Sequence, residues 1–219
     1  MSVQLPLRFR LDSHTGLEDY VGEAGRRLLA LDHLIIVYGK QGTGKSHLLQ
    51  GLCHNETGPN KSALYLPMRS SIEPVILQGL EHADLVCLDD VDKILLKPGW
   101  QKALFHLINA CRDRDTKLVL SSSETVGALS IDLPDLVSRL KGGYLVPTDR
   151  LSDGDKLKVV RIKAKRRGFD MDEDVCRYIL SRSQRDMHHL SRLVDQLDEA
   201  TLQQQKKVTI PFVKQALGL

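Results

Sequence analysis

The sequence contains no run of about 18 apolar residues, the length that a membrane-spanning helix needs, and its amino terminus lacks the apolar core of a signal peptide. It also has no C-x-x-C pair and no H-E-x-x-H motif, and its four cysteines are widely separated. This pattern is typical of small buried thiols in a reducing compartment, and it argues against disulfides and zinc sites. These absences predict a cytoplasmic protein without a membrane contact.

Neither sign of charge is in large excess. The chain carries 31 Lys and Arg against 28 Asp and Glu, which leaves a formal net charge of +3. So small a surplus does not require nucleic acid as a partner, and the even mixture of signs argues against a strongly basic DNA clamp. The 219 residues, 42% of them hydrophobic, suffice for one large domain or for a domain with a small appendage.

A phosphate-binding motif follows the apolar run at residues 34–38. Residues 39–46 match G-x-x-x-x-G-K-[ST] at every fixed position. The glycines let backbone N–H groups turn towards a phosphate, Lys45 reaches the β- and γ-oxygens, and the Ser46 hydroxyl ligates Mg²⁺. The motif predicts a bound nucleoside di- or triphosphate. The predicted contacts are a histidine at position 48 together with Gly39, Gln41, Gly42, Thr43, Gly44, Lys45 and Ser46.

The order of apolar runs predicts an α/β core followed by helices. The expected strands span residues 34–38, 62–66, 85–88, 117–120 and 144–146, a spacing typical of parallel strands joined by crossover helices. A helix is expected near 22–31. Beyond Pro147 we expect only helices, at 152–167, 172–182, 187–206 and after Thr209, with Ser152 as the first N-cap. The predicted parts are an N-terminal segment (1–12), a core with a five-stranded parallel sheet (13–149) and a small helical lid (150–219).

Polar residues follow two of the expected strands. Asp89 and Asp90 end the apolar run at 85–88, where the phosphate loop is also expected. We predict that Asp89 holds Mg²⁺ through water and that Asp90 orients an attacking water; the alternative is that both acids cap the following turn. The serines at 121–123 either contact the γ-phosphate or begin a loop, and the sequence favours neither.

The residues alone leave the roles of two cationic segments undecided. Arg139 lies in a short helical segment at 133–140 and could reach a γ-phosphate held by a neighbouring subunit, although most loop arginines are solvated. Residues 161–167 form the densest basic run. We favour the exposed end of an amphipathic helix over DNA contact for this run, because cations are stabilising near a helix C-terminus.

Together these residues resemble the DnaA branch of the AAA+ ATPases over nearly the whole chain. Residues 14–22 look like the family's N-terminal motif beside adenine, which implies nucleotide contacts for Tyr20 and Val21. The Asp-Asp pair is similar to the DnaA subgroup, and residues 136–140 look like the box that carries the arginine finger, which implies that role in trans for Arg139. Residues 186–190 align with the second sensor, with His188 at its position. The resemblance implies ADP or ATP with Mg²⁺ as cofactor.

The N-terminus resembles peptides that dock on the bacterial replication sliding clamp. Its predicted clamp-binding residues are Gln4, Leu5, Leu7 and Phe9. The sequence ends directly after the lid, where the initiator DnaA continues into a DNA-binding domain. The combination is similar to a DnaA homologue that inactivates the initiator. It implies as partners the DNA polymerase III sliding clamp (β subunit), DnaA, DNA mainly through the clamp, and a possible homodimer.

Departures from the family pattern concern hydrolysis. Ser123 stands where an acidic or amide sensor is usual, and His188 stands where the lid sensor is normally Arg. Asp90 is one methylene shorter than the glutamate common in AAA+ proteins. The intact loop with altered sensors predicts nucleotide binding with slow self-hydrolysis. The alternatives are an autonomous AAA+ ATPase acting as a helicase loader or DnaA-like replication factor, and a DNA-binding initiator fragment.

Overall fold

The computed structural model describes residues 16–218 except 70–71, 98, 185 and 205–206, and it leaves out the side chains at 188 and 204. The described chain divides into two compact units. One contains the residues up to 18 together with 24–39 and 45–148, and the other contains 19–23, 40–44 and the residues from 149 onward. The predicted domain boundaries at 12/13 and 149/150 stay a prediction.

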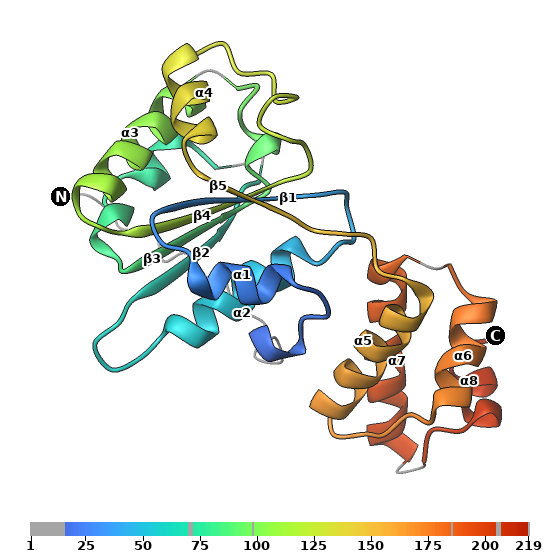
Figure 1. Cartoon of the computed structure of the whole chain (residues 1–219). Coiled ribbons are helices and arrows are strands. Elements are labelled where there is room, and N and C mark those ends of the chain that lie inside the picture. Colours follow the sequence, from blue (N-terminus) through green and yellow to red (C-terminus); the bar gives the residue numbers. More distant parts are fainter. Residues whose placement is uncertain (1–15, 70–71, 98, 185, 205–206, 219) are drawn as a thin grey trace. The chain divides into compact units, whose positions relative to one another are not determined.

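Five strands form the sheet of the first unit in the order β2-β3-β4-β1-β5, and every neighbouring pair is parallel (Figure 1). β3, the second strand in this order, is buried at all five residues, as expected for a strand covered on both faces. The predicted parallel sheet is confirmed, and its strands begin and end within two residues of the expected positions. The strands are β1 (Leu34–Tyr38), β2 (Ala63–Pro67), β3 (Leu85–Asp89), β4 (Lys117–Ser122) and β5 (Tyr144–Pro147).

Helices cover both faces of this sheet. Helices α1 (Ala24–Ala30) and α2 (Lys45–Glu56) lie on one face, and α3 (Trp100–Asp113) and α4 (Pro134–Lys141) lie on the other (Figure 1). Trp100 is 1% exposed and packs in one apolar cluster with residues of β3, β4 and α4. Short 3-10 turns connect the larger elements: η1 (Leu17–Asp19), η2 (Pro74–Leu77), η3 (Leu80–His82) and η4 (Val91–Lys93).

The C-terminal part of the second unit is helical, as predicted. Its helices are α5 (Asp153–Arg166), α6 (Glu173–Arg182), α7 (Met187–Gln204) and α8 (Ile210–Leu217). They enclose a separate apolar core, in which Leu190 and Leu197 of α7 are fully buried. Separate cores are what allow the lid and the sheet to form as independent compact units.

Hydrogen bonds at helix ends explain where two lid helices begin. The Ser152 hydroxyl accepts a hydrogen bond from the Asp155 N–H at 3.1 Å, and the Thr209 hydroxyl accepts one from the Phe212 N–H at 3.4 Å. Each bond satisfies a donor that the helix itself leaves unpaired. The expected N-cap at Ser152 is therefore confirmed.

All four cysteines are buried as free thiols, which confirms their predicted place in the core: Cys53, Cys87, Cys111 and Cys176. Burial raises the pKa of the Cys111 thiol to about 12 and that of the Cys176 thiol to about 11. No helix among the described residues is long and apolar enough to cross a membrane.

The cap at Ser152 gives a test of lid stability. We expect Ser152→Ala to lower the free energy of unfolding of the lid by about 1 kcal/mol, because the first turn of α5 loses a bond to an otherwise unpaired N–H. Urea unfolding followed by circular dichroism measures the change. Ser130→Ala is the control, since Ser130 is exposed and its hydroxyl makes no hydrogen bond within the described part of the chain. Equal stability of the two variants would contradict the cap.

The same cap gives a pH dependence. The hydrogen bond from Ser152, followed by that from Lys158, holds the pKa of Asp155 below its ordinary value. A carboxylate with a lowered pKa stabilises the folded state fully above its unfolded pKa of about 4, and this contribution is lost as pH falls through the folded pKa. We therefore expect the stability deficit of Ser152→Ala to shrink in urea titrations as the pH falls below about 4.

Candidate nucleotide site

The segment after β1 has the conformation of a phosphate-binding loop. Gly42 and Gly44 adopt φ angles of 81° and 87°, which side chains other than glycine rarely adopt. A Cβ atom at Gly44 would lie 3.0 Å from the Tyr20 ring, so both backbone angle and space require glycine there. The loop leads directly into α2, whose first-turn N–H groups and dipole favour an anion.

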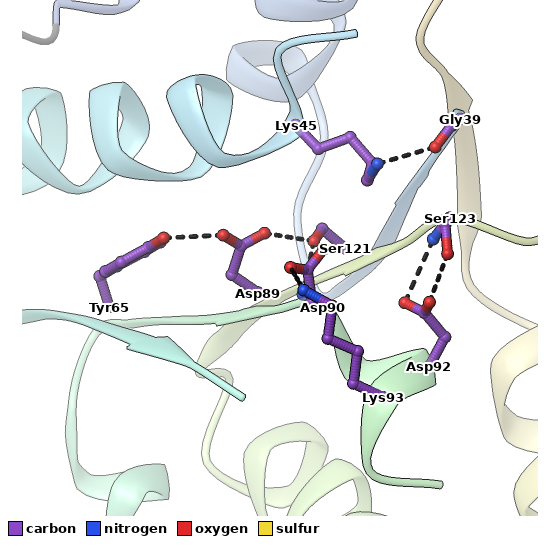
Figure 2. A network of polar contacts seen from close by, with 9 residues as sticks. All are labelled: Gly39, Lys45, Tyr65, Asp89, Asp90, Asp92, Lys93, Ser121 and Ser123. Carbon is purple, nitrogen blue, oxygen red and sulfur yellow. Dashed lines mark hydrogen bonds and ion pairs between the residues drawn. The ribbon is translucent and has the colours of Figure 1, made fainter. Parts of the chain in front are cut away.

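Lys45 is the buried cation of this loop. The residue is only 6% exposed, and its Nζ donates a hydrogen bond to the Gly39 carbonyl at 2.7 Å (Figure 2). The Gly39 N–H in turn donates to the Ser122 carbonyl at 3.2 Å, which ties the start of the loop to β4. A buried lysine beside a curled backbone fits a phosphate group chemically, because the lysine supplies a positive charge and the backbone supplies N–H donors.

The other predicted loop residues divide by exposure. Ser46 and Gln41 are exposed, whereas Thr43 is 2% exposed and its hydroxyl donates to the Lys40 carbonyl at 2.8 Å. Ser46 is thus available to a metal ion, while Thr43 shapes the loop.

The predicted histidine contact at position 48 is wrong. That position is Leu48, whose side chain is fully buried in the core, and an apolar side chain offers no hydrogen-bond donor to a phosphate. The histidine in the first turn of α2 is His47, whose ring Nε2 lies 3.0 Å from the Gly16 carbonyl oxygen. Neighbouring helical positions point about 100° apart, so a shift of one position exchanges a polar, half-buried side chain for a core residue.

Asp89 ends β3 and is 3% exposed. One carboxylate oxygen accepts a hydrogen bond from the Tyr65 hydroxyl at 2.7 Å, and the other accepts one from the Ser121 hydroxyl (Figure 2). Burial, followed by the charge of Asp89, raises the pKa of Tyr65 well above its ordinary value, so the phenol stays a donor. The two donors satisfy both oxygens of this buried carboxylate and fix its orientation where a metal ion would be held.

Sequence reasoning missed Tyr65. It lies on β2, and the parallel register sets the last residue of that strand, Pro67, beside Asp89. A single tyrosine in an otherwise aliphatic strand that borders the acidic strand is the signal that could have identified it. Its role is to orient the carboxylate, since its hydroxyl hydrogen goes to Asp89.

Asp90 faces a different partner. Its φ angle is 60°, its N–H donates to the Ser121 hydroxyl at 2.8 Å, and its carboxylate forms an ion pair with Lys93 Nζ at 2.5 Å (Figure 2). The hydrogen bond from Lys93 to Asp90 raises the pKa of the lysine. Asp90 is the N-cap residue of η4, but its side chain makes no capping hydrogen bond, so the alternative role as a cap is not seen for it.

Ser123 is held by a third acid. Both its N–H, at 3.2 Å, and its hydroxyl donate to the Asp92 carboxylate, one to each oxygen. Asp92 belongs to η4, the same short turn that carries Lys93. Contact of the serines with a γ-phosphate stays a prediction. In the structure Ser121 and Ser122 end β4, Ser123 follows the strand, and Ser121 and Ser123 donate hydrogen bonds to carboxylates.

The residues expected beside adenine belong to the second unit. The Tyr20 ring packs against Gly22 and Gly44, and burial, with a smaller contribution from Asp149, raises its pKa to about 12. Val21 next to it is half-buried. His188 lies in the first turn of α7, but its side chain lies outside the described part of the structure, as do the predicted clamp-binding residues at 4–9.

Arg139 lies at the opposite edge of the sheet from the phosphate loop. It lines a hollow of about 440 Å³ together with residues at the amino ends of β1, β4 and β5, among them Leu34, Thr116 and Tyr144. The loop follows the carboxyl end of β1. The half-buried Arg139 side chain forms no ion pair or hydrogen bond with any described residue.

The basic run at 161–167 is largely paired inside the second unit. Arg166 Nε lies 2.8 Å from Asp19, Arg167 pairs with Asp195 and lies 3.7 Å from Asp198, and Lys163 donates to Ser191 at 3.0 Å. The exposed cations of the run are Arg161, Lys165 and Arg166, of which Arg166 is paired with Asp19. The arrangement agrees with the preferred interpretation as a helix end.

Comparison with known proteins agrees with this site. The model of the bacterial DnaA ATPase domain matches residues 30–147, and the model of the Hda lid domain matches residues 153–217. An uncharacterized protein of Haemophilus influenzae is 35% identical, with both chains covered fully. The chain belongs to the DnaA family of AAA+ ATPases. The Hda-type lid further fits Hda, the DnaA homologue, which confirms the resemblance seen in the sequence.

Solved structures support the fold. Domain III of the Thermotoga maritima initiator DnaA has a TM-score of 0.77 at 20% identity, covering 96% of this chain and 98% of that one. AMPPCP-bound DnaA from Aquifex aeolicus has a TM-score of 0.69 at 24% identity, covering 88% and 67%. The Thermotoga maritima RuvB branch migration motor reaches 0.66 at 16% identity, covering 93% and 71%. At these identities the likeness concerns the AAA+ fold.

The glycines of the loop give a direct test of the site. We expect Gly44→Ala to weaken ADP and ATP affinity by about tenfold or more, because a Cβ forces the loop out of its left-handed angle and against Tyr20. Isothermal titration calorimetry measures the dissociation constants. Gly127→Ala is the matched control, because nothing lies within 4 Å of a Cβ there. Equal affinity of both variants would exclude this loop as the phosphate site.

Proposed function

We propose that this protein is a nucleotide-bound negative regulator of bacterial replication initiation. Docked on the DNA-loaded sliding clamp, it stimulates ATP hydrolysis by the initiator DnaA. The proposal makes the protein an activator of another ATPase and gives it little hydrolysis of its own. Its support comes from the family membership, the phosphate loop and the place of Arg139.

The cofactor in this proposal is ADP or ATP with Mg²⁺. Lys45 and the backbone of the glycine loop would hold the phosphates, and Ser46 and Asp89 would hold the metal ion directly or through water. The left-handed glycines and the buried ammonium support this assignment. Mg²⁺ supplies charge neutralisation for the phosphates, and Tyr65 and Ser121 keep the Asp89 carboxylate in place for it.

The place of Arg139 is the observation that carries the proposal. A strand of five residues is about 16 Å long, so an arginine at the amino ends of the strands does not reach a phosphate held at their carboxyl ends. A guanidinium that is unpaired among the described residues is instead available at this edge to the nucleotide of a second molecule. There it would neutralise charge that develops on the phosphoryl group in the transition state.

The partners follow from the same scheme. Residues 4–9 would bind the β subunit of the DNA polymerase III clamp, and Arg139 would face DnaA. DNA would be reached mainly through the clamp, which agrees with a basic run that is paired internally. A homodimer is a further contact that a finger in trans permits. The protein would then act in the cytoplasm at the nucleoid.

The second candidate is an autonomous AAA+ ATPase, such as a helicase loader or DnaA-like factor. The intact loop and the two carboxylates at the end of β3 favour it, because these are the parts that hydrolysis needs. Against it, the second acid and the sensor serine are both engaged by η4. The rate of hydrolysis by the chain alone separates the two candidates.

The decisive measurement is ATP hydrolysis by DnaA with this protein and DNA-loaded clamp. We expect Arg139→Ala to reduce the stimulated rate by about 10³-fold or more while nucleotide and clamp affinities stay unchanged, because only the charge supplied in trans is lost. Lys141→Ala is the control, since it removes an equal charge from the same helix. Full stimulation by Arg139→Ala would exclude the finger, and clamp-independent hydrolysis by this chain alone would favour the second candidate.

Clamp docking is tested separately. We expect the double variant Gln4→Ala, Leu5→Ala to lose clamp affinity by about tenfold or more in surface plasmon resonance, because a docked extended peptide depends on a few anchoring side chains. Its ADP affinity should match that of the unchanged protein, and Ser2→Ala should bind the clamp normally. Unchanged clamp affinity of the double variant would assign docking to another surface.

A further inference from the structure

We propose that the η4 turn restrains the protein's own hydrolytic site. Lys93 holds the Asp90 carboxylate, and Asp92 holds Ser123, so that neither group is presented to an attacking water. Lys93 is therefore a positioning residue that suppresses hydrolysis. This inference rests on the proposed nucleotide site, but it needs neither DnaA nor the clamp.

The hold on Asp90 has two points of attachment. The backbone is fixed by the hydrogen bond from the Asp90 N–H to Ser121 at 2.8 Å, and the side chain is fixed by the ion pair to Lys93 at 2.5 Å (Figure 2). Both contacts come from elements at the same sheet edge. Together they direct the carboxylate towards η4, which follows it in the chain.

The hold on Ser123 is bidentate. Its N–H and its hydroxyl each donate to one oxygen of Asp92, so its hydroxyl hydrogen is committed to a carboxylate. Figure 2 shows this pair beside the Asp90–Lys93 pair, with both acceptor and cation supplied by residues of one short turn. A serine in this state does not donate to a phosphate until the contact breaks.

The turn that supplies both contacts is itself anchored. Val91 and Ile94, on either side of Asp92 and Lys93, are 1% and 0% exposed and belong to the main apolar core. The core therefore fixes where the two polar side chains start. The restraint therefore depends on the whole turn. Val91 and Ile94 fix its position, and Asp92 and Lys93 between them contact Ser123 and Asp90.

The chemistry of hydrolysis shows why this matters. Asp90 would accept the proton that is released as a water oxygen bonds to the γ-phosphorus of ATP and the β–γ bridging bond breaks, with ADP as leaving group. A carboxylate held by an ammonium at hydrogen-bond distance is turned away from the water, and this contact must open before the carboxylate can take the proton. Loss of the ammonium should therefore release a competent base.

The experiment compares ATP hydrolysis by this chain alone with Mg²⁺. We expect Lys93→Met to raise the turnover rate by about 10- to 100-fold, up to the lower end of the 10²–10⁴-fold that a general base typically contributes, while the ATP dissociation constant changes less than about twofold. Lys93→Arg, which retains the ion pair, should keep the low rate. Lys102→Met, which removes an exposed lysine from α3, is the control.

Two further variants make the test specific. The double variant Lys93→Met, Asp90→Ala should lose the gain, because the released base is gone. Lys93 is 62% exposed in its side chain and such pairs contribute little to stability, so thermal unfolding of Lys93→Met should match that of the unchanged protein. An unchanged rate in a folded Lys93→Met variant, or a gain that survives without Asp90, overturns the proposal.

A second readout requires no hydrolysis. Mass spectrometry after brief acetylation reports how accessible each lysine is, and Lys93 should react at least about threefold faster in Asp90→Asn than in the unchanged protein, because the ion pair is lost. Lys102 serves as the internal reference. Equal reactivity of Lys93 in both overturns the proposal. If the unchanged protein fails to bind nucleotide, the proposed function fails too; if it binds but Lys93→Met gains nothing, only this inference fails.

Discussion

The common direction of the five strands decides which residues can meet in this protein. Because every neighbouring pair is parallel, the ends of β1, β3 and β4 bring the phosphate loop, the aspartates and the serines to one edge. The opposite edge receives the hollow that Arg139 lines. The parallel arrangement thus separates the groups that would bind the protein's own nucleotide from Arg139, which would act on the nucleotide of another molecule.

The second constraint is the cost of gathering carboxylates at one end of the sheet, where Asp89 is buried and Asp90 and Asp92 are partly buried. Three aspartates lie within four positions at the end of β3, and each has found its own donors: Tyr65 and Ser121 for Asp89, Lys93 for Asp90, and Ser123 for Asp92. Charged groups that leave water need such partners. The partners that these carboxylates bind also determine which acid is free to react.

Much of the fold could be predicted because its signals are local. Aliphatic runs marked all five strands, and Ser152 and Thr209 marked the starts of two lid helices, since a cap depends on residues only three positions apart. Family resemblance and motif together indicated the phosphate loop and the lid. These features need no knowledge of how distant segments approach one another.

The parts of the site that sequence did not predict depend on approach between segments. Tyr65 meets Asp89 only through the register of β2 on β3, and Arg166 meets Asp19 across 147 positions of the chain. Lys93 and Asp90 are close in sequence, but their pairing depends on the orientation of the turn that carries Lys93. The burial of Val91 and Ile94 fixes that orientation.

The burial of the four thiols has a practical consequence for work on this molecule. Thiolates are the reactive form, and burial together with raised pKa values keeps Cys87, Cys111 and Cys176 protonated, while Cys53 is fully enclosed in the core. Maleimide reagents should therefore modify an introduced surface cysteine far faster than any native one. Fluorophores can be attached at chosen positions on the sheet unit and on the helical unit without first removing native cysteines, which makes the distance between the two units measurable during nucleotide binding.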